Sequence, residues 1–572
     1  MKLMMRYLKP YVPLLLLGSL AALAAAVGNL MLPSLMSDIL NRGVYQKDFS
    51  YILGCCAWML GVALVSMGAT LAGSWITCKV VARFCGDLRV DIFRKVNSMT
   101  FEEFGRLGAA ALVTRATHDV QTVSWIAGEV SNSVFTIPML FFGGVAMAMA
   151  KDVTLSLTML AFVPVILVIV LRVGRNIVPL WIRSDEYTDR QNDLMRQRLR
   201  GIRVIRAFNA ESVEQTRIAD ATRIMAENII KSNVSMGVIS PLATFLLNVA
   251  VVLLVYLGGV RMEQGNRLSG GDVFAIVQYV NLISNALIMA AFSIVMFPHA
   301  QIAAKRIGQV MNAQTMSDPI AASGIVLRGG IAFEQVSFRY DGAQDSALRN
   351  VTFSVEPGEK IAVIGGTGSG KSTLAALLLG FRMPTEGSVK LDGISTERLS
   401  RKDMRANMSV CLQSAAIYSG TVRDNLTMGK PDASDEELWS ALETAQGADF
   451  VRSFPEGLDH EIKQSGKNLS GGQKQRLSIA RAVLKDAPIF LFDDSFSALD
   501  FLTEAKLRAA LGQRIHGKTQ IIITQRVSSA MHADRIVVMD NGTVVGEGTH
   551  ETLMKTCGVY REIHASQTGG AS

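Results

Sequence analysis

The stretch IAVIGGTGSGKST, residues 361–373, decides the fold of the C-terminal part of the chain. Four apolar residues enter a glycine-rich turn, which leads into the apolar stretch LAALLLG. This matches G-x-x-x-x-G-K-[ST], the phosphate-binding P-loop, in its expected strand–loop–helix context. Backbone N–H groups of such a loop surround phosphate oxygens, and the following helix adds its positive dipole end. We therefore predict an α/β P-loop NTPase domain that binds ATP and Mg²⁺.

Within the P-loop, Lys371 is expected to reach the β- and γ-phosphates, and the Ser372 hydroxyl to ligate Mg²⁺. The glycines allow the backbone to curl closely around the phosphates. The predicted nucleotide-binding residues of this loop are Gly365, Gly366, Thr367, Gly368, Ser369, Gly370, Lys371, Ser372 and Thr373.

A second apolar stretch ends in paired carboxylates, in IFLFDDSFSALD, residues 489–500. An Asp-Asp pair alone is a weak signal, because many such pairs cap loops. Its position behind an apolar strand and well after a P-loop favours Asp493 as the carboxylate on the Mg²⁺ side. Asp494 then stands where a base would orient the attacking water.

The first half of the chain is too apolar for an ordinary soluble protein. The 572 residues are 49% hydrophobic, with a mean hydropathy of +0.29, and the apolar residues concentrate before residue 310. Helices rise ~1.5 Å per residue, so runs of 18 or more apolar residues can cross a ~30 Å hydrocarbon core. Six such runs predict six transmembrane helices, with a tight hairpin between the third and the fourth. The runs lie at 12–37, 52–77, 129–150, 152–172, 238–260 and 272–297.

Lysine and arginine residues predict the orientation in the membrane. They concentrate in the long loops 78–128 and 173–237, whereas the intervening loops 38–51 and 261–271 are short. The positive-inside rule then places the N-terminus, both long loops and the NTPase domain in the cytoplasm of a multi-pass cell-membrane protein. This topology accounts for most of the net charge of +8. We therefore interpret the arginine-rich loop as a solvated cytoplasmic helix near anionic lipid and expect no nucleic-acid partner. The six cysteines lack CxxC or metal-ligand spacing and are expected to be reduced.

These patterns predict two domains. An all-α six-helix transmembrane domain with long cytoplasmic helical extensions covers residues 1–313. A polar linker covers 314–328, the α/β nucleotide-binding domain covers 329–566, and a flexible tail covers 567–572.

The stretch NLSGGQKQR, residues 468–476, precedes the helical stretch LSIARAVL. With it, the sequence resembles the ATP-binding cassette (ABC) transporters, whose signature motif is LSGGQ. The resemblance covers nearly the whole chain and is closest to exporter half-transporters. It extends to residues 102–120 and 205–218, which resemble the cytoplasmic loops whose coupling helices touch the nucleotide-binding domains. A solvated helical face is the alternative interpretation of the residues in these segments, namely Arg115, His118, Asp119, Phe208 and Glu211.

The resemblance implies roles at matching positions. Tyr340 would stack on adenine, and Gln413 would contact Mg²⁺ and the attacking water. Asp500 ends the D-loop SALD. In this family two nucleotide-binding domains close head to tail, so that each ATP lies between the P-loop of one chain and the signature of the other. The residues that would serve the partner's nucleotide are Ser470, Gly471, Gly472 and Gln473.

Two positions depart from the family pattern. Asp494 stands in place of a glutamate and is shorter by about one C–C bond, ~1.5 Å. A misplacement of ~1 Å can cost on the order of 10²-fold in rate. Gln525 stands in place of a histidine that contacts the γ-phosphate, and it cannot carry a positive charge. The chain thus resembles the degenerate-site subunit of heterodimeric bacterial multidrug exporters, and a homodimer with two slow sites is the alternative.

The sequence leaves the substrate open. The apolar runs carry no internal charge, which disfavours a strongly ionic substrate and favours export of hydrophobic or amphipathic small molecules, multidrug or lipid-like. Two alternatives remain: an exporter-fold importer of metal–chelator complexes, and a channel or regulator that uses ATP only as a switch.

Overall fold

The computed structural model describes residues 6–264, 268–316 and 324–568. The chain divides into two compact units. One comprises Met1–Met99 and Glu103–Gln314, and the other comprises Thr100–Glu102 and Thr315–Ser572. The predicted linker 314–328 begins at this boundary. The linker and the predicted tail 567–572 both lie partly outside the described residues.

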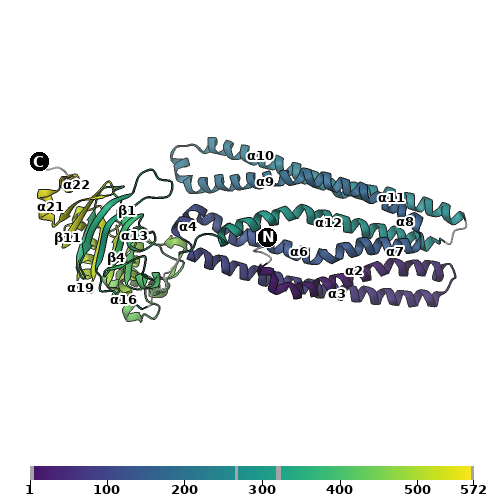
Figure 1. Ribbon diagram of the computed structural model, residues 1–572, viewed down its shortest axis with the longest axis horizontal. Helices are drawn as coiled ribbons and strands as arrows, with labels where there is room; N and C mark the ends of the chain where they lie inside the picture. The colour runs from purple at the N-terminus through teal and green to yellow at the C-terminus, as the bar shows by residue number, and fades with distance from the viewer. Residues whose placement is uncertain (1–5, 265–267, 317–323, 569–572) are drawn as a thin grey trace. The chain divides into compact units, whose positions relative to one another are not determined.

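The first unit consists of long helices that run side by side (Figure 1). Helix α3 alone has 50 residues, which corresponds to about 75 Å at the rise of an α-helix. It therefore extends far beyond a ~30 Å hydrocarbon core, as expected for membrane helices that continue into the cytoplasm. The main helices are α2 (Val12–Asp38), α3 (Phe49–Ser98), α6 (Val120–Pro138), α7 (Gly144–Lys151), α8 (Val153–Leu160), α9 (Phe162–Ala207), α10 (Glu211–Gly237), α11 (Ile239–Glu263) and α12 (Gly270–Met311).

Five helical segments of the described chain are long and apolar enough to cross a membrane. The fourth predicted run, 152–172, corresponds to α8 and the start of α9, and some of its side chains lie outside the described residues. The five segments are Arg6–Val44, Phe49–Ser98, Ala109–Lys151, Thr244–Glu263 and Gly270–Met311.

Ion pairs join the ends of four of these helices. Helix α7 ends at Lys151, whose ammonium lies 3.1 Å from the carboxylate of Asp272 at the start of α12. Asp152 caps α8 by accepting a hydrogen bond from the Leu155 backbone N–H, and it pairs with Arg261 of α11 at 3.1 Å. The close hairpin predicted at residues 151–152 is thus tied to α11 and α12.

The second unit contains two main sheets. The first is antiparallel, with the strand order β2-β1-β4-β5, and the second has the order β12-β11-β3-β10-β9-β6. In the second sheet only the β11–β12 pairing is antiparallel. The strands are β1 (Ile331–Phe338), β2 (Leu348–Val355), β3 (Lys360–Ile364), β4 (Glu386–Leu391), β5 (Ile394–Ser395), β6 (Met408–Cys411), β9 (Ile489–Asp493), β10 (Thr519–Thr524), β11 (Arg535–Asp540) and β12 (Thr543–Gly548).

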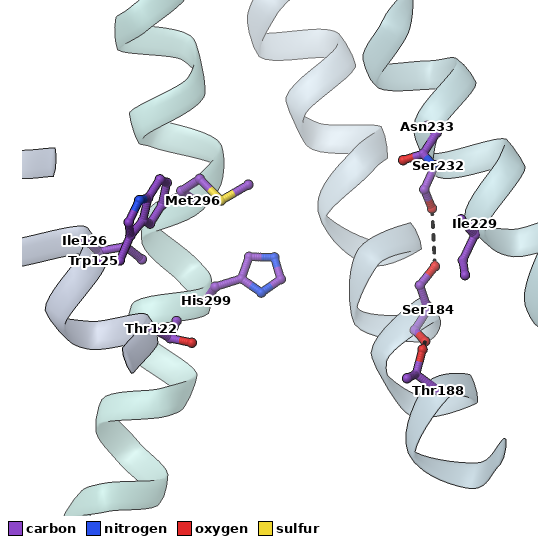
Figure 2. Close-up of a pocket in the computed structure, with 10 residues that line it drawn as sticks. All are labelled: Thr122, Trp125, Ile126, Ser184, Thr188, Ile229, Ser232, Asn233, Met296 and His299. Atoms are coloured by element: carbon purple, nitrogen blue, oxygen red, sulfur yellow. Dashed lines mark hydrogen bonds between the residues drawn. The ribbon is translucent and has the colours of Figure 1, made fainter. Parts of the chain in front are cut away.

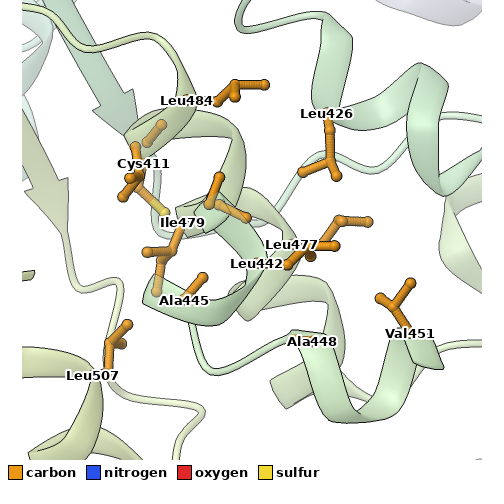
Figure 3. Close-up of a cluster of buried hydrophobic side chains, with 14 of the residues drawn as sticks. Cys411, Leu426, Leu442, Ala445, Ala448, Val451, Leu477, Ile479, Leu484 and Leu507 are labelled. Carbon is orange, nitrogen blue, oxygen red and sulfur yellow. The ribbon is translucent and has the colours of Figure 1, made fainter. Parts of the chain in front are cut away.

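Helices cover the sheets and form a separate helical layer. Helices α15 to α18 pack around one buried hydrophobic cluster, in which Leu442 and Leu477 are fully buried (Figure 3). All six cysteines are free in the structure, and their reduced state stays a prediction. The principal helices are α13 (Lys371–Leu378), α14 (Arg401–Ala406), α15 (Val422–Thr427), α16 (Asp435–Thr444), α17 (Ala448–Arg452), α18 (Gly471–Leu484), α19 (Phe501–Arg514), α20 (Val527–Ala530), α21 (His550–Thr556) and α22 (Gly558–Thr568).

Truncating Phe490 is expected to destabilise this unit. Its ring is fully buried in the cluster beneath α18, so Phe490→Ala removes apolar contacts and leaves a cavity. Such changes cost about 3–5 kcal/mol. Phe501→Ala, at a ring that is 73% exposed, is the matched control and should cost far less. Trp439 packs against the same cluster, so its fluorescence during urea unfolding reports the difference.

Candidate functional site

The predicted catalytic residues follow neighbouring parallel strands. The P-loop follows β3, Gln525 follows β10, Asp493 ends β9 and Gln413 follows β6. These strands are adjacent in the order β3-β10-β9-β6, and their pairings are parallel. The carboxyl ends of adjacent parallel strands meet at one edge of a sheet, where α/β proteins bind ligands. The fold therefore gathers the P-loop, both aspartates and both glutamines at one edge.

Lys371 is buried and forms hydrogen bonds with the P-loop. Its Nζ donates hydrogen bonds to the carbonyl oxygens of Gly365, at 2.7 Å, and Gly366, at 2.6 Å, and to Ser369 Oγ at 3.1 Å. Burial lowers the pKa of Lys371, although the carboxylates of Asp493 and Asp494 oppose this shift. The ammonium is thus positioned inside the loop that would surround the phosphates.

Two glycines of the loop have no substitute. A Cβ on Gly365 would lie 2.2 Å from the carbonyl oxygen of Met539, which is backbone and cannot give way. Gly370 has φ +98° and directly precedes α13, so a side chain there would be strained as well as crowded by Leu348. The close packing of the loop against neighbouring residues therefore requires glycine at both positions, even without a bound phosphate.

The paired carboxylates differ in their surroundings. Asp493 is buried, and desolvation together with the charge of Asp494 raises its pKa, although Lys371 partly offsets this. A divalent cation beside two adjacent carboxylates would stabilise their charged forms. The residues therefore fit Mg²⁺, which Ser372, Gln413 and Asp493 would hold. When bound, the ion would neutralise phosphate charge.

Removing the charge at position 494 should shift the pH dependence of Mg²⁺ binding. Asp494→Asn deletes one cause of the raised pKa of Asp493, so that pKa falls. Since a metal ligand must be ionised, Mg²⁺-dependent binding of a fluorescent ATP analogue should persist to lower pH in the variant. Asp500→Asn, at an exposed helix cap, should leave the pH midpoint unchanged. If the pH midpoint of Mg²⁺-dependent binding were unchanged in Asp494→Asn, Asp493 would not be the Mg²⁺ ligand.

The backbone fixes Asp494 in an unusual conformation. Its φ is +46°, in the left-handed region, and its N–H donates to the Ile523 carbonyl at 2.8 Å. Ser497 Oγ donates to the Asp494 carbonyl at 2.8 Å, and Arg526 Nη2 donates to the Ser497 carbonyl at 2.8 Å. The D-loop and the segment that carries Gln525 are thus tied together by Arg526. Arg526 was not predicted from the sequence, because the only local signal for it is its position directly after Gln525.

The aromatic side chain predicted to stack on adenine lies above the P-loop helix. Tyr340 Oη is 3.0 Å from Thr373 Oγ1, and the Arg382 guanidinium lies over the Tyr340 ring at 4.6 Å from its centroid. Arg382 also pairs at 3.1 Å with Glu102, which belongs to the same unit. Arg382 was missed from the sequence, since no local pattern relates it to Tyr340.

The signature residues form a helix cap beside the D-loop. Ser470 Oγ accepts a hydrogen bond from the Gln473 N–H, and Gln473 accepts one from the Ser470 N–H, which makes a capping box on α18. A Cβ on Gly472 would lie 3.4 Å from the Ala498 carbonyl oxygen. Among the described residues, no hydrogen bond or ion pair joins residues 470–473 to the P-loop. The S-x-x-Q spacing could have revealed this cap from sequence.

Two of the predicted coupling residues, both in the first unit, differ in exposure. Asp119 is buried and lies 3.7 Å from Arg306 of α12. Phe208 is 79% exposed, at the end of α9. Their role in coupling stays a prediction.

The first unit also contains a cavity of about 420 Å³ between four helices (Figure 2). Trp125 and His299 approach it from α6 and α12, and Ser184 and Ser232 approach it from α9 and α10. The two serine hydroxyl oxygens lie 3.3 Å apart. The lining combines aromatic, thioether and hydroxyl groups, from Thr122, Trp125, Ile126, Ser184, Thr188, Ile229, Ser232, Asn233, Met296 and His299.

Helices that can span a membrane, a P-loop and a capped LSGGQ helix on one chain define a membrane protein with an ATP-binding cassette. Family models give the same result. Residues 15–287 match the ABC transporter transmembrane region, and residues 348–497 match the ABC transporter ATP-binding domain. The chain belongs to the ABC transporter family. It is a multi-pass membrane protein whose ATPase domain binds ATP, usually with Mg²⁺, and couples hydrolysis to transport.

Relatives of the same length support this assignment. An uncharacterized ABC transporter ATP-binding protein of Mycobacterium tuberculosis is 33% identical over 578 residues, which cover 100% of this chain and 98% of that protein. An ATP-dependent lipid A-core flippase of Chromobacterium violaceum is 27% identical, with 98% and 96% covered. The structure of a bacterial Atm1-family ABC exporter with ATP bound matches with a TM-score of 0.81 at 22% identity, over 99% of both chains. That match establishes the exporter-type fold.

Proposed function

We propose that this chain is one half of a heterodimeric ABC exporter and supplies its degenerate, ATP-retaining site. Its intact signature, residues 470–473, would complete the catalytic site on the partner's P-loop. The complex would lie in the cell membrane with the ATPase units in the cytoplasm. ATP would clamp the two ATPase units together, and hydrolysis at the partner's site would reset the transporter.

The observation that carries this proposal is the pair Asp494 and Gln525 at the ends of adjacent strands, beside a complete P-loop. The left-handed φ of Asp494 is a conformation that aspartate adopts more readily than most residues. Its carboxylate is also shorter than that of glutamate by ~1.5 Å. Gln525 can donate a hydrogen bond to phosphate but carries no charge. This half-site is therefore better suited to holding ATP than to activating water.

The cavity beside Trp125 supports a hydrophobic or amphipathic substrate. Trp125 and Met296 offer apolar surface, whereas the serine and threonine hydroxyls offer hydrogen bonds. Such a mixture suits molecules with an apolar body and a few polar groups. The Chromobacterium violaceum relative is named a lipid A-core flippase, and a lipid-like substrate for this chain is consistent with that name.

The first test is the composition of the native complex. The tagged chain is purified from its host in mild detergent and its companions are identified by intact mass. A second ABC half-transporter at one-to-one stoichiometry supports the heterodimer. Two copies of this 61.9 kDa chain alone would make Asp494 the working base of a slow homodimer.

A mutation separates the two assemblies further. In the heterodimer, Asp494→Ala should lower ATP turnover by less than about tenfold, because the productive base belongs to the partner. Loss of a working general base costs about 10²–10⁴-fold. Asp494→Glu should likewise change turnover less than the partner's Glu→Gln. Abolition of all turnover by Asp494→Ala would exclude the degenerate-site assignment.

Transport direction needs its own measurement. In inverted membrane vesicles the ATPase units face the external medium. If the complex is an exporter, addition of ATP to that medium should make the vesicles accumulate an amphipathic dye. Uptake of metal–chelator complexes into right-side-out cells would indicate the importer alternative. Conductance that depends on nucleotide without coupled flux would indicate the channel alternative.

A further inference from the structure

A second cavity lies in the ATPase unit, between the sheet and helix α19. It has a volume of about 300 Å³ and is bordered by Lys360 and Gln520, which lie at the beginnings of strands β3 and β10. Its other end reaches Phe492 and Phe496, on either side of the paired carboxylates. We call it the α19 pocket. The P-loop follows the opposite end of β3, so the α19 pocket is separate from the nucleotide site.

The polar wall of the α19 pocket carries two permanent cations, Lys360 and Arg508. Lys360, Arg508 and His516 line it, and Asp534 is the acidic residue among its lining groups. Lys360 Nζ forms no hydrogen bond or ion pair with the described residues. The Asp534 carboxylate instead accepts a hydrogen bond from the Lys360 backbone N–H at 3.0 Å. A half-buried ammonium beside a guanidinium, with no hydrogen-bonded anion, is a costly arrangement that a bound anion would relieve.

Two basic groups near the α19 pocket have lowered pKa values. Burial lowers the pKa of Lys360; the Asp534 carboxylate opposes this shift, and Arg508 makes a smaller lowering contribution. Burial also lowers the pKa of His532, with contributions from Arg508 and Lys360. Glu504 opposes the shift of His532, and burial is the largest cause of both shifts.

The opposite wall is apolar. Phe492, Leu511 and Ile522 line it, and each is less than 5% exposed. A volume of about 300 Å³ is at the lower end of small-molecule sites. A bare inorganic anion would leave this wall without a partner, whereas an anion with an apolar body would cover it.

We propose that the α19 pocket binds a small organic anion, with its carboxylate or phosphate between Lys360 and Arg508 and its aromatic or short aliphatic body against Phe492. The proposal is independent of whether the transporter is a heterodimer or a homodimer.

Arg508 also contacts the helix that follows Gln525. Its Nη1 donates to the Ser528 carbonyl of α20 at 2.7 Å and lies 3.7 Å from the buried carboxylate of Glu504. Glu504 accepts a hydrogen bond from Ser529 Oγ at 2.6 Å. Helix α20 begins two residues after Gln525. Arg508 thus links the α19 pocket to the segment that follows Gln525.

Binding of 2-naphthoate to the purified full transporter at saturating ATP tests the proposal, because ATP fills the P-loops. Equilibrium dialysis should show saturable binding at least about tenfold tighter than that of neutral 2-naphthalenemethanol, since hydrogen bonds to charged groups contribute ~1.5–3 kcal/mol. Lys360→Gln should weaken naphthoate binding about tenfold or more. Lys518→Gln, at a nearby lysine that pairs with Asp486 and does not line the pocket, should leave it unchanged.

A second variant fills the α19 pocket. A Cβ on Gly512 would meet no atom within 4 Å, and replacing a glycine inside a helix favours folding. Gly512→Leu should therefore fold, retain basal ATPase activity and lose naphthoate binding. Equal binding of the acid and the alcohol, or equal naphthoate binding by the wild type, Lys360→Gln and Gly512→Leu, would overturn the proposal.

Discussion

Replacing Ser470 by arginine is expected to reduce ATP turnover of the assembled transporter by roughly 10²–10³-fold, the cost of losing one donor aimed at developing charge. Ser470 caps α18, and its exposed hydroxyl and the helix N-terminus would face the γ-phosphate on the partner's P-loop. Arginine removes the hydroxyl and occupies the space of that phosphate. ATP retained on this chain's own P-loop should be unaffected in a heterodimer, because the partner's signature covers it.

A matched control separates catalysis from folding. Ser434 caps α16 with the same capping box, in which Ser434 Oγ accepts from the Glu437 N–H at 3.3 Å, as Ser470 Oγ does from the Gln473 N–H at 3.3 Å. Loss of either cap costs ~1 kcal/mol of stability. Ser434→Arg should therefore destabilise the protein to a similar extent while preserving turnover. If the two variants lost turnover equally, Ser470 would have only a structural role.

Much of the ATPase unit could be predicted from local patterns. The P-loop glycines, the apolar strand before Asp493 and the capped signature helix each carry their structure within about ten residues, so periodicity and motif spacing were sufficient. The ends of the transmembrane helices were predicted less accurately. Their apolar runs mark the hydrocarbon core, whereas α3 continues to Ser98 on polar residues whose helical state depends on packing against α6 and α12.

The contacts that shape the nucleotide site were not predictable from one sequence. Arg382 is 42 residues from Tyr340, and the two meet only because β1 and the segment after α13 are folded together. Glu504 resembles an ordinary surface residue of an amphipathic helix, yet it is 2% exposed and accepts a hydrogen bond from Ser529. The left-handed backbone at Asp494 results from the sheet edge and the D-loop together. Each of these features depends on contacts between segments that are distant in the sequence. Local sequence propensity does not predict such contacts.

Replacing Lys371 by methionine is expected to produce the opposite result to Ser470→Arg. Lys371 Nζ is buried inside the P-loop, within hydrogen-bond distance of two loop carbonyls, where it would reach the phosphates. A hydrogen bond to a charged group contributes ~1.5–3 kcal/mol, so ATP affinity at this site should fall about 10–150-fold. Radiolabelled ATP that remains bound after rapid gel filtration should be lost. Turnover should fall far less, because the productive P-loop belongs to the partner.

Lys485→Met is the matched control for this loss. Lys485 is also a half-buried lysine that donates to backbone carbonyls, those of Met408, at 2.6 Å, and Arg405, but these lie outside the P-loop. It should retain ATP. The two substitutions at the nucleotide sites then decide the assembly. In a heterodimer, Ser470→Arg strongly lowers turnover and spares ATP retention, whereas Lys371→Met strongly lowers ATP retention and largely spares turnover. In a homodimer every nucleotide site contains both Ser470 and Lys371, so each substitution would impair both ATP turnover and ATP retention. That outcome would exclude a heterodimer in which one chain retains ATP and the other supplies the productive P-loop.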